Sequence, residues 1–150
     1  MSYTNYFSNM ELTIKNKKLI LVTGDIFKMR DKIEQLILTV SGGYMASQIH
    51  WYSRGNCSTQ IEEYKLEDIP GEVTKMLDLA SANGLRSVGM NAARTTGGKE
   101  ANYMGQGVMI KACLEWLEKN QTSSLEKIYL VDLNPNRNFE TAYNDFVKGN

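Results

Sequence analysis

The sequence predicts an α/β protein in which a mixed, mostly parallel central sheet lies between layers of helices. Short apolar runs typical of buried strands, at residues 19–22 and 36–40, alternate with segments whose apolar residues recur at helical spacing. Glycine-bearing turns follow strand-like runs at residues 23–26 and 95–98. Because strand–turn–helix connections present backbone N–H groups to phosphorylated ligands, the first interpretation is a nucleotide-binding domain.

Length and charge limit the class of protein. The chain has 150 residues, which fits one domain over residues 11–150 preceded by a polar N-terminal arm at 1–10. Lys plus Arg and Asp plus Glu both number 17, so a net charge of zero gives no reason to expect nucleic acid or a membrane surface as a partner. Cys57 and Cys113 are too few for a disulfide framework or a zinc cluster, so free thiols are expected.

Hydropathy and the N-terminus indicate the compartment. No apolar run reaches the roughly 20 residues that a bilayer-spanning helix needs. Residues 1–9 are polar and aromatic and carry no hydrophobic signal region. We therefore expect a cytoplasmic protein, located in the host cytoplasm if the source is a virus.

The first half of the chain predicts an edge strand followed by two buried strands. Leu12 and Ile14 alternate with polar residues, as in a half-exposed edge strand. Residues 19–22 are all apolar and residues 36–40 are apolar except for Thr39, which is typical of strands covered on both faces.

The middle of the chain gives weaker signals. Residues 46–52 are expected to form a short helix that ends near Gly55, and residues 58–66 are ambiguous, with a short strand as one interpretation. Residues 87–91 and 127–131 are predicted as further strands.

A helix is predicted from Pro70, because proline suits the first helical position, where its missing N–H would have no partner. Asn83 and Gly84 end this helix, with glycine at the left-handed cap. Its apolar residues fall on one face: Val73, Met76, Leu77 and Ala80.

Two further helices follow the same spacing. Residues 108–119 form the first, and the second closes the chain. The apolar face of the first carries Ile110, Cys113, Leu114 and Leu117, and that of the second carries Phe139, Ala142, Tyr143 and Phe146.

Four segments follow the predicted strands: residues 24–26, 41–44, 92–98 and 132–134. Ligands of open α/β sheets bind outside the carboxyl ends of the strands, so these segments are the candidate binding edge. Two of them contain a glycine pair, which permits the positive φ that an anion nest needs, and which equally suits a plain tight turn.

Several common sites are excluded by spacing. The chain has no Gly-x-x-x-x-Gly-Lys-Ser/Thr motif, and residues 21–24 begin a dinucleotide fingerprint that the following residues do not continue. His50 is the single histidine; no Gly-x-Ser-x-Gly elbow and no Cys/His cluster accompany it, so no hydrolytic triad and no metal site are expected. Asp25 either caps the next helix or faces a ligand amine or hydroxyl.

The order of these segments resembles that of a macrodomain, the ADP-ribose-binding α/β module, over nearly the whole chain from Glu11. Residues 19–26 are similar to the opening strand of that family, and residues 42–50 to its glycine-rich segment around the distal ribose. Residues 79–98 resemble its helix, strand and diphosphate loop. The runs at 114–117 and 128–132 resemble its final helix and strand. The resemblance implies a three-layer α/β/α fold.

The resemblance has departures. The usual Asn-Ala-Ala-Asn after the third strand is replaced by Thr39, Val40 and Ser41 in this chain. The places of the lysine and the aspartate used by the glycohydrolase branch hold His50 and Lys99. These differences weigh against the usual de-ADP-ribosylation chemistry.

The resemblance implies that the chain binds ADP-ribose or a related nucleotide without a cofactor. Asp25 would contact adenine, loop amides would hold the diphosphate, and Tyr44 could stack on a ring. The alternative is a hydrolase, either an ADP-ribose-1''-phosphate phosphatase or an ADP-ribosyl hydrolase acting on an ADP-ribosylated protein, with His50 as general base. A third hypothesis is a protein-interaction module without a ligand. The expected ligand-binding residues are Asp25, Ile26, Gly42, Gly43, Tyr44, Thr95, Thr96, Gly97, Gly98, Lys99, Asp132 and Asn134.

Overall fold

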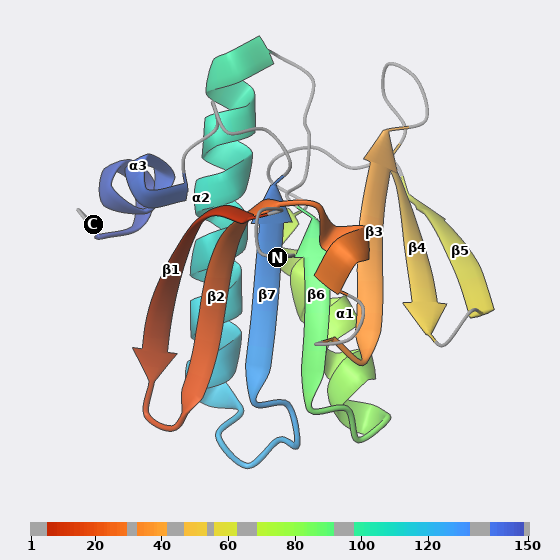
Figure 1. Cartoon of the computed structure of the whole chain (residues 1–150). Coiled ribbons are helices and arrows are strands. Elements are labelled where there is room, and N and C mark those ends of the chain that lie inside the picture. The colour runs from red at the N-terminus through yellow and green to blue at the C-terminus, as the bar shows by residue number, and fades with distance from the viewer. Residues whose placement is uncertain are drawn as a thin grey trace.

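A computed structural model describes residues 6–29, 33–41, 47–53, 56–62, 69–91, 98–132 and 139–148 of the chain. Seven strands form one sheet in the order β1-β2-β7-β6-β3-β4-β5 (Figure 1). The strands are β1 (Tyr6–Ile14), β2 (Lys17–Gly24), β3 (Gln35–Ser41), β4 (Ser47–Ser53), β5 (Asn56–Glu62), β6 (Ser87–Asn91) and β7 (Lys127–Asp132). The helices are the 3-10 turn η2 (Ile26–Met29), α1 (Ile69–Ala82), α2 (Gly98–Lys119), α3 (Phe139–Tyr143) and the π-helical turn η4 (Asn144–Lys148).

The sheet is mixed, as predicted for this α/β fold, and its parallel part lies at the centre. β2 pairs with β7, β7 with β6, and β6 with β3, all in parallel. The flanking pairs β1–β2, β3–β4 and β4–β5 are antiparallel. The carboxyl ends of β2, β7, β6 and β3 therefore share one edge of the sheet (Figure 1).

One face of the sheet packs against the long helices. Leu19 and Leu21 of β2 point to this face, where α1 and α2 lie side by side behind the sheet (Figure 1). The indole nitrogen of Trp116 in α2 donates a hydrogen bond of 2.8 Å to the carboxylate of Asp78 in α1, which ties the two helices together. The fully buried residues of this core include Leu77, Ile110, Cys113, Leu117, Ile128 and Leu130.

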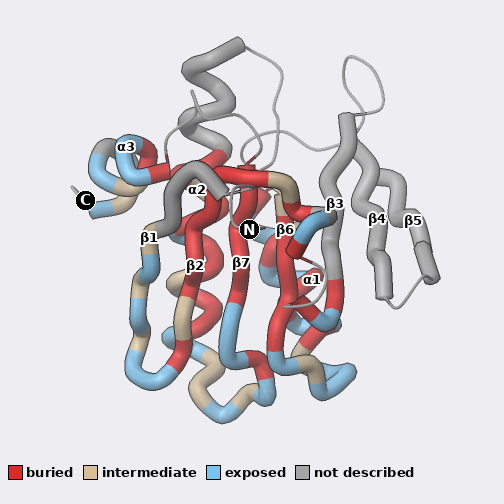
Figure 2. Tube along the Cα trace, viewed as in Figure 1, coloured by how far each residue is buried: buried red, intermediate tan, exposed pale blue. Residues whose placement is uncertain are grey.

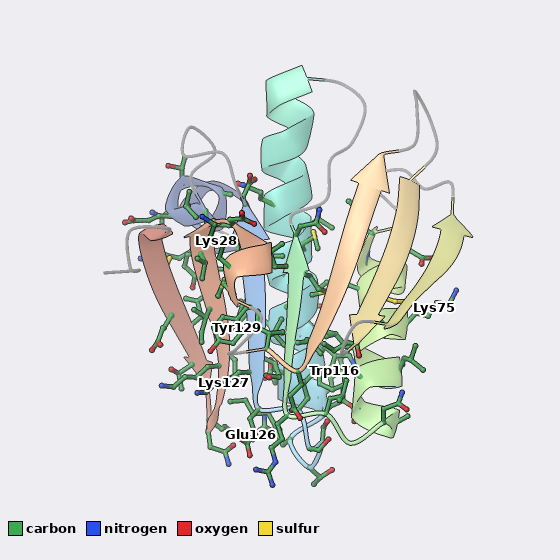
Figure 3. The ribbon with its side chains drawn as sticks, turned by 45° about the vertical axis from the view of Figure 1, so that its right-hand side comes forward. Lys28, Lys75, Trp116, Glu126, Lys127 and Tyr129 are labelled. Carbon is green, nitrogen blue, oxygen red and sulfur yellow. The ribbon has the colours of Figure 1, made fainter. Side chains whose placement is uncertain are left out.

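The opposite face is covered by a much shorter segment. Ile20 and Val22 of β2, which alternate with the residues under the helices, pack with Tyr129 and Val131 of β7. Ile26, Met29 and Ile33, from η2 and the chain after it, close this second cluster. Trp116 and Tyr129, labelled in Figure 3, belong to the two clusters on opposite faces. Within the described residues, η2 is the helical element on this face of the three-layer arrangement, whereas α1, α2 and α3 contribute to the other face.

The predicted helix from Pro70 is confirmed as α1. All four residues of its predicted apolar face, Val73, Met76, Leu77 and Ala80, are buried. Gly84 follows the helix with a φ of 70°, the left-handed conformation that ends it.

The helix predicted over residues 108–119 begins earlier, at Gly98. Its first turns extend beyond the carboxyl ends of the strands (Figure 1). The apolar periodicity therefore predicted only the part of α2 that packs on the core, whose buried residues are coloured red in Figure 2.

The helix expected at residues 46–52 is wrong, because Ser47–Ser53 form strand β4. β4 pairs on both sides, with Ile49 opposite Thr39 of β3 and Gln60 of β5. Its β-branched and aromatic residues favour a strand, and the pairing partners decide the choice in a segment this short. The ambiguous stretch that follows contains β5.

The two ends of the chain extend the fold. β1 begins at Tyr6, so Tyr6 and residues 8–10 of the expected arm pair with β2. At the other end, Phe139 and Ala142 of α3 are buried against the α2 side of the core, and α3 continues as η4.

We expect Gly84→Ala to destabilise the protein by about 1 kcal/mol, because alanine is strained at a φ of 70°. The matched control is Gly71→Ala in α1, which should stabilise the protein by about 0.5–1 kcal/mol. A Cβ built at either glycine meets nothing within 4 Å, so the backbone conformation alone decides the sign. Urea unfolding of both variants measures the difference; a shift of the same sign in both would contradict this account.

Burial raises the pKa of the Cys113 thiol to about 12, from an unperturbed value of 9.0. The unfolded chain therefore ionises this thiol first, and stability is lost as the pH rises above about 9. Relative to Cys113→Ala, the wild type should lose about 1.4 kcal/mol of stability per pH unit in this range. Denaturant unfolding of both proteins between about pH 8 and pH 10.5 tests the slope, and parallel profiles would refute it.

Candidate functional site

The candidate site lies at the shared edge where the four parallel strands end, which we call the carboxyl rim. Its four strand ends are Gly24 of β2, Asp132 of β7, Asn91 of β6 and Ser41 of β3. Parallel pairing brings these ends together although they are far apart in the sequence. This is the edge at which open α/β sheets bind ligands.

Asp25 directly follows β2 at the rim and is half-buried. Its backbone carbonyl accepts a hydrogen bond of 3.1 Å from the N–H of Lys28, so Asp25 stands at the entrance of η2. Ile26 is buried in the cluster under η2, which fixes the direction of the chain after Asp25. Sequence reasoning placed both residues at this edge, and the structure does the same.

Asp132 ends β7 and pairs in register with Thr23 of β2. Its side chain is buried on the helical side of the sheet, where the amide nitrogen of Gln106 in α2 donates a hydrogen bond of 2.7 Å to it. The bond joins residues 26 positions apart and ties α2 to the rim.

Gln106 was not predicted as a site residue. It is 1% exposed, and its side-chain oxygen is buried without a hydrogen-bond partner. A signal was present: Gln106 precedes Met109 and Ile110 by three and four positions, so it is a polar residue on the apolar face of the helix.

The N-terminus of α2 lies beyond the rim (Figure 1). Gly98 and Lys99 are its first two residues, whereas sequence reasoning placed them in a loop. The first N–H groups of a helix have no intrahelical partner, and the helix dipole adds a partial positive charge there. An anion is favoured at this end of α2.

Several predicted site residues fall outside the described part of the chain. They are Gly42, Gly43, Tyr44, Thr95, Thr96, Gly97 and Asn134. The described residues that flank them, Ser41, Asn91, Gly98 and Asp132, all belong to the elements that meet at the rim.

His50 lies within β4, opposite Leu38 of β3 and Thr59 of β5. With strands spaced about 4.8 Å apart, four steps separate β4 from β2, so the backbone of His50 lies roughly 19 Å from the β2 end of the rim. The structure therefore does not bring His50 next to Asp25.

Neither a metal-binding cluster nor a membrane-spanning helix occurs in the described ranges. There, no group of three or more His, Cys, Asp or Glu residues could hold a metal ion. No helix in the same ranges has the length and apolarity needed to cross a bilayer.

Comparison with solved structures identifies the fold. The Oceanobacillus iheyensis macrodomain with ADP aligns with a TM-score of 0.58 at 12% identity, over 95% of this chain and 96% of that one. Two mutants of the same macrodomain also align over 95% of this chain. One covers 97% of the solved chain with a TM-score of 0.59 at 12% identity, and the other, with ADPR, covers 98% with a TM-score of 0.58 at 11% identity.

No protein-family model and no curated protein sequence matches the chain. The structural likeness nevertheless extends over nearly the whole of both chains. The chain has the macrodomain fold, in a divergent form, as the order of its sequence segments predicted.

We expect Asp132→Ala to destabilise the protein by about 1–3 kcal/mol, because it leaves the buried Gln106 amide without its acceptor. Gln106→Met, which is similar in length, removes the donor. In a double-mutant cycle the two changes should couple by at least about 0.5 kcal/mol, measured by urea unfolding. Other contacts of Asp132 cancel in the cycle, so strictly additive effects would exclude the hydrogen bond as a stabilising interaction.

Proposed function

We propose that the chain binds ADP-ribose or a related ADP-ribose-containing nucleotide at the carboxyl rim. The observation that carries the proposal is the macrodomain fold over 95% of the chain, shared with solved structures that contain ADP and ADPR. Two features of the rim support the proposal, the N-terminus of α2 and the carboxylate of Asp25.

The diphosphate needs positive potential, and the chain has no net charge to supply it. Backbone N–H groups are the alternative source. The N-terminus of α2 at Gly98 provides them, and the segments that contain the two glycine pairs begin at the ends of β3 and β6. We propose that the loop amides of these segments hold the diphosphate.

The nucleotide base and sugars carry hydrogen-bond donors. Asp25 follows β2 at the rim and is half-buried, so its carboxylate is partly shielded from water and close to the proposed ligand. A charge-assisted bond from the adenine amine to this carboxylate would orient the base.

The proposal concerns ligand binding and includes no catalytic step. The hydrolase alternative depends on His50 as general base, and its place within β4, four strand positions from β2, separates it from Asp25.

Titration calorimetry should detect saturable binding of ADP-ribose to the wild type. A ligand at 100 times its dissociation constant should also stabilise the folded protein by about 2.7 kcal/mol in a thermal shift. Asp25→Ala should weaken binding about tenfold, because one hydrogen bond to a charged group is lost.

The control is Glu126→Ala, which removes an exposed acid next to the amino end of β7, at the opposite edge of the sheet (Figure 3). The affinity of Glu126→Ala for ADP-ribose should equal that of the wild type. Absence of heat at millimolar ADP-ribose would contradict the proposed function, and equal losses in the two variants would contradict the role of Asp25.

A further inference from the structure

The side-chain oxygen of Gln106 is a buried acceptor without a donor. The side chain is 1% exposed, so bulk water does not reach it. An ionised carboxylate can only accept, which turns the amide nitrogen of Gln106 toward Asp132 and its oxygen away. Buried polar groups without a partner are rare in native proteins, and each calls for a physical explanation.

The position of this oxygen connects it with the carboxyl rim. Asp132 is the last residue of β7 and pairs with Thr23, two residues before Asp25. The hydrogen bond from Gln106 to Asp132 places this part of α2 beside the end of β7. A second buried amide atom without a partner, the nitrogen of Gln35, lies at the amino end of β3, at the opposite edge. Its position gives it no relation to the rim.

No described side chain donates to this oxygen. The next described residues on the helix face that Gln106 shares, Met109 and Ile110, are buried and apolar. A hydrogen bond in such a setting is strong, and a missing one is costly. A molecule bound at the rim, next to the Asp132 carboxylate that Gln106 contacts, is a candidate source of this donor.

We propose that Gln106 is a positioning residue of the carboxyl rim. Its amide nitrogen fixes the Asp132 carboxylate, and its oxygen accepts a hydrogen bond that becomes available when the nucleotide binds. The donor is a hydroxyl or amino group of the nucleotide, or a water molecule that the bound nucleotide traps. This inference rests on the proposed function, because it assigns a role to Gln106 in binding the same ligand.

The role explains why a polar side chain is retained on a helix face that is otherwise buried among apolar residues. In the free protein one of the two polar atoms of the amide is satisfied. In the complex both would be satisfied, so part of the binding free energy comes from completing the hydrogen bonds of Gln106.

The test compares Gln106→Met with the wild type by titration calorimetry with ADP-ribose, at a temperature where circular dichroism shows both proteins folded. The affinity of Gln106→Met for ADP-ribose should fall about tenfold or more. The variant no longer fixes the Asp132 carboxylate, and it lacks the oxygen that would accept the new hydrogen bond. The matched control is Gln121→Met. Gln121 donates to the backbone oxygen of Leu117 at 2.7 Å near the other end of α2, and its loss should leave the affinity within about twofold of wild type.

A merely structural role would lower the melting temperature of Gln106→Met without changing its affinity, and that result overturns the inference. Absence of binding by the wild type overturns the proposed function and this inference with it. Wild-type binding with an unchanged variant overturns the inference alone.

A measurement on the wild type keeps the test independent of the folding of the variant. The side-chain amide resonance of Gln106 in a nitrogen–proton correlation spectrum should shift when ADP-ribose saturates the protein. A crystal structure of the complex should show a nucleotide atom or a water within about 3.2 Å of the Gln106 oxygen, and it distinguishes the two donors. An unchanged resonance, or an oxygen still without a donor in the complex, overturns the inference.

Discussion

The burial of the central parallel strands on both faces is the constraint on which the rest of the structure depends. Leu19 and Leu21 of β2 pack under the helices, while the alternating Ile20 and Val22 pack under the η2 segment. A shift of β2 by one residue would exchange these two sets, so the register of the strand is fixed by packing. That register sets Thr23 opposite Asp132 and thereby determines which side chains meet at the carboxyl rim.

The helix α2 has two parts with different surroundings. From Met109 onward its buried face packs on the sheet and on α1, and Trp116 is tied to Asp78. Its first turns extend beyond the strand ends, where the helix N-terminus can favour an anion (Figure 1). Gln106 marks the change between the two parts, since it is the buried polar residue that joins the helix to the end of β7. The core and the candidate site are thus built on one rigid element.

Features set by residues close together in the sequence could be predicted, whereas features set by residues far apart in the sequence could not. The helix α1 was predicted with its buried face and its glycine cap, because those signals lie within one local segment. Residues 46–52 were assigned wrongly, since the pairing of β4 with both β3 and β5 is not visible in a short window. The Gln106–Asp132 bond, and the buried Lys17 amine that donates to the backbone oxygen of Ser123 at 2.8 Å, join distant residues that no local pattern connects.

The charges along the rim constrain how an anionic nucleotide can lie on it. Asp25 directly follows β2 and Asp132 ends the adjacent strand β7, whereas the ends of β6 and β3 are the uncharged Asn91 and Ser41. Two neighbouring carboxylates repel phosphate at close range, and partial burial strengthens this repulsion. A bound nucleotide of the proposed kind would therefore place its donor-bearing base over β2 and β7, and its diphosphate toward β6 and β3. The glycine pairs follow β3 and β6 in the sequence, and these are the two strands that the electrostatic argument selects.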